Sequence, residues 1–321
     1  LKNINIRLVK LLCPRNKISI ISDFKFFLSL FSYFRKEKPN LVVSYTIKPL
    51  IYSGLLSRIF KFRYVPIVTG LGYAFQSPNF IRKILRKLVI SLYKSSFKNV
   101  EKAIFQNSDN IKLFDSEGII PFDRSFLIPG DGVNLPQVLE KEINNPLRFV
   151  CVCRLLGEKG LRELSEAISI VKLDYPDFSV ELYGPLESSN DRITEEELSE
   201  WTLNNTLVWK GYCSDIPHLM KNTDIFVLPS HHEGMCTSVA EAVSYGVPII
   251  GTNIAGIREM VSGNGFLVDV KSTQQLAWSL TRAINLSEKE WREMSDKSVS
   301  FSYANLDRKS LMNKIYDVVM Q

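Results

Sequence analysis

Short apolar runs alternate with segments of helical periodicity along almost the whole chain. The apolar runs predict strands at residues 5–10, 41–45, 64–68, 102–105, 126–128, 148–153, 179–183, 207–209, 225–228, 248–251 and 266–268. Helical patterns lie between them, for example at 161–174, 216–221 and 237–245. Strands that alternate with helices predict parallel sheets, and therefore a doubly wound α/β fold.

The alternation pauses at a polar stretch with turn residues, 141–146. A chain of 321 residues favours two domains, so we expect a first domain at 1–143 and a second at 144–321. The last helical pattern, 306–320, can pack on either domain. No strand and glycine-containing turn come before residues 5–10, so we expect the first β-α-β unit of the first domain to be missing.

Composition narrows the class of protein. Hydrophobic residues make up 45% of the chain and charged residues 23%, which excludes a disordered chain. No apolar stretch approaches the roughly 20 residues of a membrane-spanning helix. The five cysteines include no C-x-x-C pair. This favours a reducing, cytoplasmic compartment.

Positive charge is concentrated in the first half of the chain. Residues 1–145 contain 23 Lys and Arg against 10 Asp and Glu, whereas the remainder contains 17 against 24. Within 79–98 the apolar side chains form one helical stripe, and Arg82, Lys83, Arg86 and Lys87 lie off it. Such a helix suits an anionic membrane surface, although a core helix with a solvated face has the same pattern. Nucleic acid is disfavoured, because no nucleic-acid motif is present.

The strongest chemical signal follows the predicted strand 225–228. The residues Ser230-His-His-Glu-Gly234 lead into a helix near Met235, and Glu241 lies about two turns into that helix. Unpaired N–H groups at a helix N-terminus favour an anion such as a diphosphate. Glu233 stands at the carboxyl end of a strand, where open α/β sheets bind ligands. Adjacent His231 and His232 are more typical of loop residues that line a pocket than of a metal site.

A second group of residues follows the predicted strand 148–153. Arg154 and Lys159 are separated by four residues, and Gly157 and Gly160 interrupt the chain around Lys159. Two cations at a strand–helix turn can hold a diphosphate, the Arg by its planar fork and the Lys as a point charge. With the two glutamates at the same edge of the sheet, they predict a pocket for a nucleotide diphosphate.

Both groups resemble the motifs of retaining GT-B glycosyltransferases of the GT4 type. The resemblance rests on Arg154-x4-Lys159, Glu233-x7-Glu241, Leu228-Pro-Ser-x-x-Glu-Gly and Ala255-Gly-Ile-Arg-Glu259. In the first half, Tyr45-Thr-Ile-Lys-Pro49, Thr69-Gly-Leu-Gly-Tyr-Ala-Phe75 and Phe105-Gln-Asn107 are similar to bacterial polysaccharide and lipid-linked oligosaccharide transferases. The resemblance implies two Rossmann-like domains that face a cleft and hold a nucleotide sugar between them.

The resemblance also implies roles for individual residues. Arg154 and Lys159 would neutralise the departing diphosphate, Glu233 would contact the donor sugar and Glu241 the ribose. Gly184 and Tyr212 would flank the base. The backbone N–H groups expected to bind the diphosphate belong to Gly234, Met235, Cys236 and Thr237. The acceptor-side candidates are Gly70, Gly72 and Lys48.

The partners follow from the same resemblance. The donor would be a nucleotide sugar, with UDP favoured. The acceptor would be an undecaprenyl-diphosphate-type saccharide of O-antigen or capsule synthesis at the cytoplasmic face of the bacterial inner membrane. No Asp-x-Asp occurs in the sequence, so neither a divalent metal nor another cofactor is expected.

Two other functions stay open at this point. Gly70-x-Gly72 after a strand is typical of a dinucleotide oxidoreductase, but Phe75 takes the place of the third glycine and no ribose-binding acid follows. The other is a non-catalytic GT-B module that binds only nucleotide or partner subunits, and the expected loss of the first β-α-β unit is its whole support.

Overall fold

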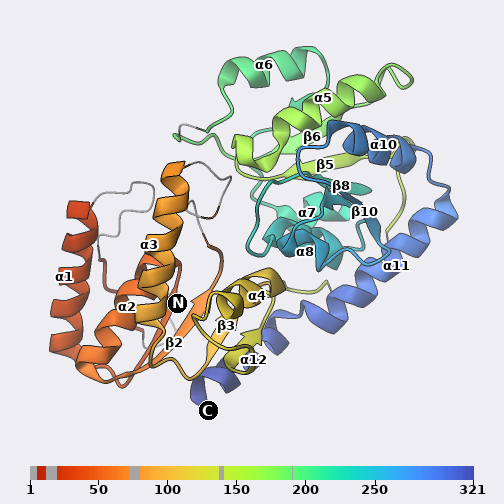
Figure 1. Cartoon of the computed structure of the whole chain (residues 1–321). Helices are drawn as coiled ribbons and strands as arrows, with labels where there is room; N and C mark the ends of the chain where they lie inside the picture. The colour runs from red at the N-terminus through yellow and green to blue at the C-terminus, as the bar shows by residue number, and fades with distance from the viewer. Residues whose placement is uncertain (1–5, 12–19, 72–74, 76–79, 137–140, 190) are drawn as a thin grey trace. The chain divides into compact units, whose positions relative to one another are not determined.

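The computed structural model describes residues 6–11, 20–71, 75, 80–136, 141–189 and 191–321. Contacts divide the chain into two compact units, Leu1–Leu127 with Asp317–Gln321, and Ile128–Tyr316. Each unit has its own parallel sheet (Figure 1). The polar stretch 141–146, expected at the domain boundary, belongs to the second unit. There Lys141 donates hydrogen bonds to the carbonyls of Met220 and Thr223.

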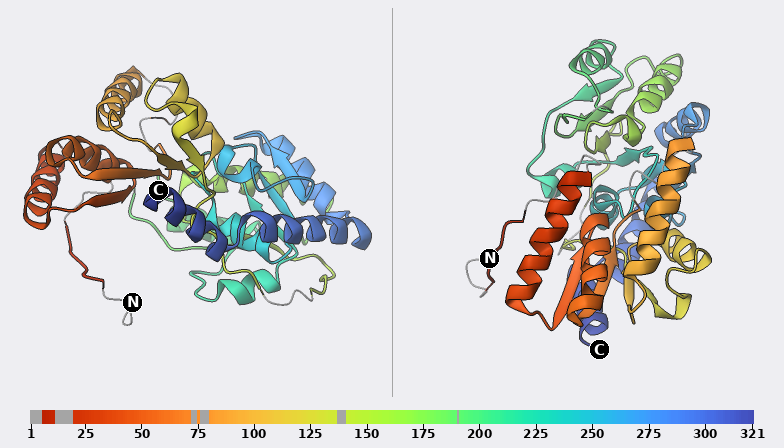
Figure 2. Two further views of the ribbon diagram at one scale, coloured as in Figure 1. Left: turned by 90° about the horizontal axis from the view of Figure 1, so that it is seen from below. Right: turned by 60° about the vertical axis from the view of Figure 1, so that its left-hand side comes forward.

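The first unit contains a four-stranded sheet of order β1-β2-β3-β4. Its strands are β1 (Leu41–Tyr45), β2 (Arg63–Val68), β3 (Ala103–Phe105) and β4 (Ser125–Leu127). The helices are α1 (Ile20–Glu37), α2 (Ile47–Phe60), α3 (Phe80–Ser96), α4 (Ser108–Ser116) and the short 3₁₀ helix η2 (Phe122–Arg124). Helix α2 contacts both α1 and α3, and the three lie side by side in the right-hand view of Figure 2.

The predicted strand at 5–10 is wrong for residues 6–10, which form no strand and are exposed. Its apolar side chains are interrupted by Arg7 and Lys10, and no strand of the described residues pairs with this segment. Arg7 instead forms an exposed ion pair with Glu37, with 3.2 Å between Nη1 and Oε1. Asn5 lies outside the described residues.

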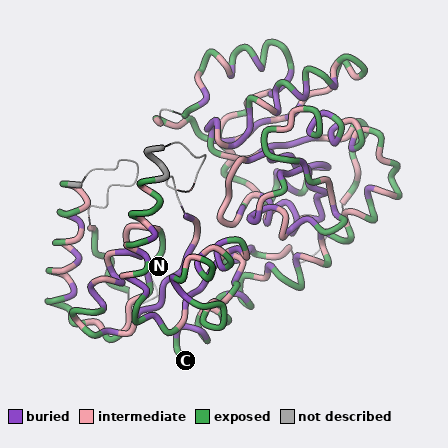
Figure 3. Tube along the Cα trace, viewed as in Figure 1, coloured by how far each residue is buried: buried purple, intermediate pink, exposed green. Residues whose placement is uncertain are grey.

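The second unit contains a six-stranded parallel sheet of order β10-β9-β8-β5-β6-β7. Its strands are β5 (Phe149–Val152), β6 (Val180–Tyr183), β7 (Leu207–Trp209), β8 (Ile225–Leu228), β9 (Ile249–Thr252) and β10 (Gly265–Val268). Strands β8 and β9 are buried along their whole length, which explains their continuous apolar runs (Figure 3).

Helices and short turns connect these strands. They are the 3₁₀ helix η3 (Gly157–Lys159), α5 (Leu161–Val171), α6 (Glu195–Leu203), α7 (Ile216–Lys221), α8 (Thr237–Ser244), α9 (Ala255–Arg258), α10 (Thr273–Ile284), α11 (Glu288–Asn305) and α12 (Arg308–Met320). The chain runs from β5 outward through β6 and β7, and then returns to β8 on the other side of β5. The carboxyl ends of β5 and β8 therefore form a topological switch point, where open α/β sheets bind ligands.

The basic helix predicted at 79–98 is confirmed as α3, and part of its apolar stripe packs on the core. Tyr93 is fully buried, whereas the exposed fractions of Ile84 and Leu88 are 58% and 57%. Helix α1 also packs on the core, through Phe26 and Leu30. None of the helices in the described part of the chain combines the length and the apolar character of a membrane span.

Candidate donor-sugar site in the second unit

A nearly buried ion pair joins the two predicted groups at the switch point. The Nζ atom of Lys159 lies 2.7 Å from Oε1 of Glu233, and the exposed fractions of the two side chains are 9% and 13%. Lys159 ends η3, just after β5, whereas Glu233 lies in the loop after β8. The structure therefore brings together two residues 74 positions apart that the sequence assigned to one pocket.

A glycine allows this close approach. Gly160 has a φ of 72°, in the left-handed region that favours glycine, and a Cβ atom there would collide with the carbonyl of Pro229 at the end of β8. Any other residue at position 160 would therefore push η3 away from the loop that carries Glu233.

The pKa of Lys159 reflects this environment. Burial acts to lower the pKa of Lys159, but the nearby carboxylate of Glu233 acts in the opposite direction, and the pKa is raised above its ordinary value. The ammonium group therefore stays charged at neutral pH. A buried cation that is held charged is suited to a diphosphate ligand.

The loop after β8 is held against the turn after β5 by further bonds. The backbone N–H of His231 donates to the carbonyl of Glu158 at 2.8 Å. The Nε2 atom of His231 lies 2.9 Å from Oε1 of Glu163 on α5. Sequence reasoning treated His231 as a loop residue and missed Glu163, because no local spacing links positions 163 and 231. Among the described residues, no group of three metal-ligating side chains occurs.

The N-terminus of α8 follows this loop. One of the backbone N–H groups predicted there to bind a diphosphate already donates to a carbonyl of the protein. The N–H of Cys236 donates to the carbonyl of Gly256 at 3.2 Å. This bond removes Cys236 from the amides expected to bind a diphosphate, and leaves Gly234, Met235 and Thr237 as predictions. Burial, followed by the charge of Glu233, raises the pKa of the Cys236 thiol to about 12. A thiol that stays neutral is a poor nucleophile, so Cys236 is not a candidate for covalent catalysis.

Glu241 lies on α8, half-buried. Burial raises the pKa of its carboxyl group, and the charge of Arg308 acts in the opposite direction. The carboxylate oxygens are acceptors only, so they suit a ligand that presents hydroxyl groups.

The other predicted residues of this unit lie around the same edge. Arg154 follows β5 with 57% of its side chain exposed, and its guanidinium is 3.9 Å from Glu158 and 3.8 Å from Glu187. Gly184 follows β6, and a Cβ atom there would collide with the carbonyl of Cys153. Tyr212 is 73% exposed.

The predicted residues of the first unit are only partly described. The Nζ atom of Lys48 forms an ion pair with Asp23 at 2.7 Å. Gly70 follows β2, whereas Gly72 and the side chains of Arg82 and Lys83 lie outside the described residues.

The two membrane candidates that are described differ from each other. Arg86 forms an ion pair with Glu117 at 3.3 Å, and its guanidinium lies 5.5 Å from the ring centre of Phe75. Lys87 is exposed.

Residues 139–298, most of the second unit, match the family described as glycosyl transferases group 1. The chain carries a domain of this glycosyl transferases group 1 family. The resemblance identified from the motifs is thereby confirmed, and the oxidoreductase interpretation is set aside.

Several relatives of this chain are named as bacterial glycosyltransferases. The Escherichia coli UDP-Gal:alpha-D-GlcNAc-diphosphoundecaprenol alpha-1,3-galactosyltransferase is 29% identical over 284 residues, which cover 83% of this chain and 71% of that enzyme. The Staphylococcus aureus capsular polysaccharide biosynthesis glycosyltransferase CapM is 26% identical, over 94% of this chain and 79% of that protein.

Solved structures share the fold. Anabaena HepE in complex with UDP matches with a TM-score of 0.74 and 18% identity, over 92% of this chain and 82% of that chain. Sucrose-phosphate synthase from Thermosynechococcus elongatus has the same TM-score and identity, over 92% and 78%. The predicted GT-B class, with two parallel α/β sheets, is confirmed.

Proposed function

We propose that this group 1 chain transfers a sugar from a UDP-sugar to a lipid-diphosphate-linked saccharide, with retention of anomeric configuration. The observation that carries the proposal is the buried Lys159–Glu233 pair at the switch point. The printed names of the relatives support the donor and acceptor classes, since the Escherichia coli enzyme uses UDP-Gal and an acceptor on diphosphoundecaprenol.

The diphosphate of the donor would lie between the cations and the start of α8. Lys159 and Arg154 would neutralise the charge that develops on the β-phosphate as the bond to the sugar breaks, which is the main electrostatic task of such a site. The amides of Gly234, Met235 and Thr237 would add hydrogen bonds to the same group. No divalent metal or other cofactor is part of this proposal, because the protein's own cations supply the charge.

The two glutamates would orient the donor. Glu233 would accept hydrogen bonds from the sugar hydroxyls, and Glu241 from the ribose hydroxyls, while Gly184 and Tyr212 would flank the base. In a retaining transfer the acceptor attacks from the face that the leaving group vacates. The leaving phosphate itself would then take the proton of the acceptor hydroxyl, so no protein base is required.

The acceptor side would be formed by the first unit. Gly70, Gly72 and Lys48 are the residues proposed there. The basic helix α3 would hold the protein at an anionic membrane surface on the cytoplasmic side, with Lys87 and the exposed Leu88 facing the lipid.

The test is a transfer assay with UDP-sugars and a short-chain undecaprenyl-diphosphate analogue that carries one N-acetylglucosamine. We expect a product whose new linkage has the anomeric configuration of the donor, as measured by NMR, and turnover that persists in EDTA. An inverted product would contradict the retaining mechanism. Binding of UDP without transfer to any acceptor of this class would favour the non-catalytic GT-B module.

A further inference from the structure

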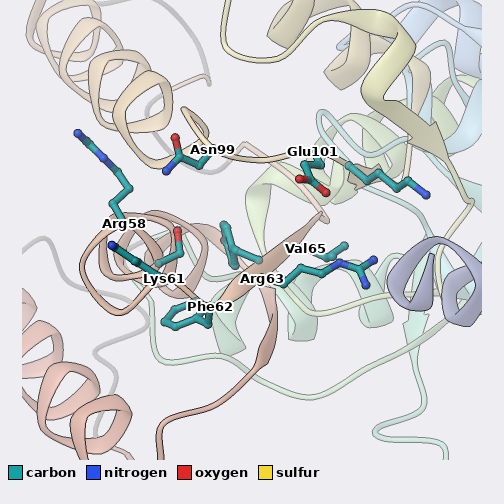
Figure 4. A pocket seen from close by; sticks show the side chains of 10 residues that line it. Arg58, Lys61, Phe62, Arg63, Val65, Asn99 and Glu101 are labelled. Atoms are coloured by element: carbon teal, nitrogen blue, oxygen red, sulfur yellow. The ribbon is translucent and has the colours of Figure 1, made fainter.

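A pocket of about 540 Å³ opens in the first unit, at the amino-terminal edge of its sheet (Figure 4). It lies where α2 turns into β2 and where α3 leads into β3. The lining residues are Ser57, Arg58, Lys61, Phe62, Arg63, Tyr64, Val65, Asn99, Glu101 and Lys102. The acceptor-side candidate Gly70 follows the opposite, carboxyl end of β2, so this pocket is separate from the proposed reaction site.

The register of the sheet explains why there is room for a pocket. Ile67 of β2 pairs with Ile104 of β3, and β3 begins only at Ala103, whereas β2 begins at Arg63. The first part of β2 therefore extends past the start of β3 without a partner on that side. Arg63, Tyr64 and Val65 of this extension all line the pocket.

Four cations surround the pocket, and one carboxylate. In Figure 4, Arg58 and Lys61 lie on one side, and Arg63 and Glu101 on the other. Among the described residues, none of Arg58, Lys61, Arg63 and Lys102 has a carboxylate oxygen within 4 Å. The contacts that these cations do form are weaker than an ion pair.

Those contacts are with neutral groups. Arg58 donates to Oγ of Ser95 at 3.1 Å, and Arg63 to the carbonyl of Met320 at 3.3 Å. The Nζ atom of Lys102 lies 5.8 Å from the ring centre of Phe126. Within the described part of the chain these positive charges thus have no ion-pair partner, and Glu101 is the one carboxylate that lines the pocket.

The surrounding sequence increases this charge. Residues 38–100 contain eleven Lys and Arg and no Asp or Glu. A concave site lined by one sign of charge raises the local concentration of counter-ions.

Two of the four cations stand at a helix end, and this position accounts for their charge without any ligand. Arg58 is in the last turn of α2 and Lys61 is its C-cap, where positive charge offsets the partial negative charge of the helix C-terminus. Arg63 and Lys102 lie at the starts of strands, where no such reason applies. An Arg fork and a Lys point charge together are suited to phosphate oxygens.

We infer that this amino-edge pocket binds an anion with more than one phosphate group, with one phosphate near Arg63 and Lys102 and another near Arg58 and Lys61. The volume is within the range of roughly 300–1,000 Å³ that small-ligand sites occupy. The inference does not depend on the proposed transfer reaction. The phosphate groups of this anion belong either to a soluble ligand or to a lipid headgroup, and the experiment distinguishes these two sources.

The first arm is calorimetric titration of inorganic pyrophosphate into the full chain, with the proposed donor site saturated by UDP. We expect one pyrophosphate to bind, and the variant Arg63→Gln with Lys102→Gln to bind it at least tenfold more weakly. The control, Lys36→Gln with Lys112→Gln, removes the same charge from exposed positions outside the pocket and should differ less than twofold from the unmodified chain. Should the first variant not fold, Arg58→Gln with Lys61→Gln takes its place.

The second arm is co-sedimentation with vesicles of phosphatidylglycerol and phosphatidylcholine. If the pocket variant loses vesicle binding as well as pyrophosphate, the phosphate source is a lipid headgroup; if it loses only pyrophosphate, the source is soluble. Equal pyrophosphate affinity of the unmodified chain and both pocket variants, or no binding by the unmodified chain, overturns the inference. If the unmodified chain binds pyrophosphate but does not bind UDP, this outcome counts against the proposed function and leaves the inference about the amino-edge pocket intact.

Discussion

Nζ of Lys159 and Oε1 of Glu233 are 2.7 Å apart in a nearly buried ion pair. Each charge therefore has the other as its counter-ion. A diphosphate that binds beside Lys159 must compete with Glu233 for the ammonium group, and Glu233 is then available to sugar hydroxyls. Binding of the proposed donor would thus exchange this contact for contacts of each side chain with the substrate.

Replacement of Lys159 tests its role in leaving-group departure. We expect Lys159→Ala to lower the rate of transfer by about a hundredfold or more, the typical cost of one preorganised charge-stabilising group. The control Lys289→Ala removes an exposed cation of α11 and should retain the unmodified rate. Glu233→Gln should lower transfer without weakening UDP binding, because Lys159 then loses a competitor. A normal rate in Lys159→Ala would disprove the assignment.

The carboxyl group of Glu241 predicts a pH dependence of nucleotide binding. Burial raises its pKa, so this group takes up a proton at a higher pH than an exposed glutamate. Only the ionised form is a pure acceptor for the ribose hydroxyls. UDP affinity, measured by calorimetry, should therefore fall as the pH is lowered from about 7.5 to about 5.

The matched control for this prediction is Glu241→Gln. The phosphate groups of UDP also titrate near pH 6, and their effect is common to both proteins. The difference in affinity between the unmodified chain and Glu241→Gln should shrink as the pH falls. A constant difference would remove Glu241 from the ribose site.

The sequence predicts the sheets well, because most strands are short apolar runs between helical patterns. The predicted bounds of β1, β7 and β8 agree with the structure. The exception is residues 6–10, where Arg7 and Lys10 interrupt the apolar pattern and none of the strands that the structure describes pairs with them. A run of apolar residues alone does not show whether another strand will cover it.

The site is predicted only where local motifs mark it. Lys159 and Glu233 stand beside glycines that follow strands, and Glu241 follows Glu233 with seven residues between, so the sequence singles them out. The contact between Glu163 and His231 and the bond from Gly157 N–H to the carbonyl of Asp191, at 2.7 Å, depend on tertiary packing. No spacing in the chain encodes such partners, and the occupied amide of Cys236 was likewise not foreseeable.

Neighbouring residues of α3 give a sharp test of membrane attachment. Lys87 is exposed, whereas Arg86 is already engaged by Glu117 at 3.3 Å and by the ring of Phe75. A basic residue near an anionic surface contributes about 1 kcal/mol. Lys87→Gln should therefore weaken binding to phosphatidylglycerol vesicles about fivefold, and Arg86→Gln by less.

Two further measurements complete this prediction. Combined replacement of Arg82, Lys83, Arg86 and Lys87 by Gln should abolish most of the salt-sensitive binding, since screening acts on exposed charges. Leu88→Asn should weaken binding that persists at high salt, because 57% of the Leu88 side chain is exposed. If all these variants bind vesicles like the unmodified chain, α3 is only a core helix with a solvated face.

Lys141 predicts a pH dependence of stability in the second unit. Burial lowers the pKa of Lys141 to about 7, with the charge of Asp224 acting in the opposite direction. In an unfolded chain a lysine keeps its proton up to about pH 10.4. Between about pH 7 and pH 10 the unfolded state therefore binds more protons than the folded state, and the free energy of unfolding should rise with pH, by at most about 1.4 kcal/mol per pH unit. Below pH 7 both states carry the proton, and this dependence disappears.

The measurement is urea unfolding followed by tryptophan fluorescence, which reports on the second unit because all four tryptophans lie there. Lys141→Met lacks the titrating group, so the stability of the unmodified chain relative to this variant should increase steadily from about pH 7 to pH 10. Lys289→Met, at an exposed position of α11, should show the same pH dependence as the unmodified chain. Parallel curves for the unmodified chain and Lys141→Met would mean that Lys141 keeps its proton while it donates to the carbonyls of Met220 and Thr223, with the ring of Trp291 beside it.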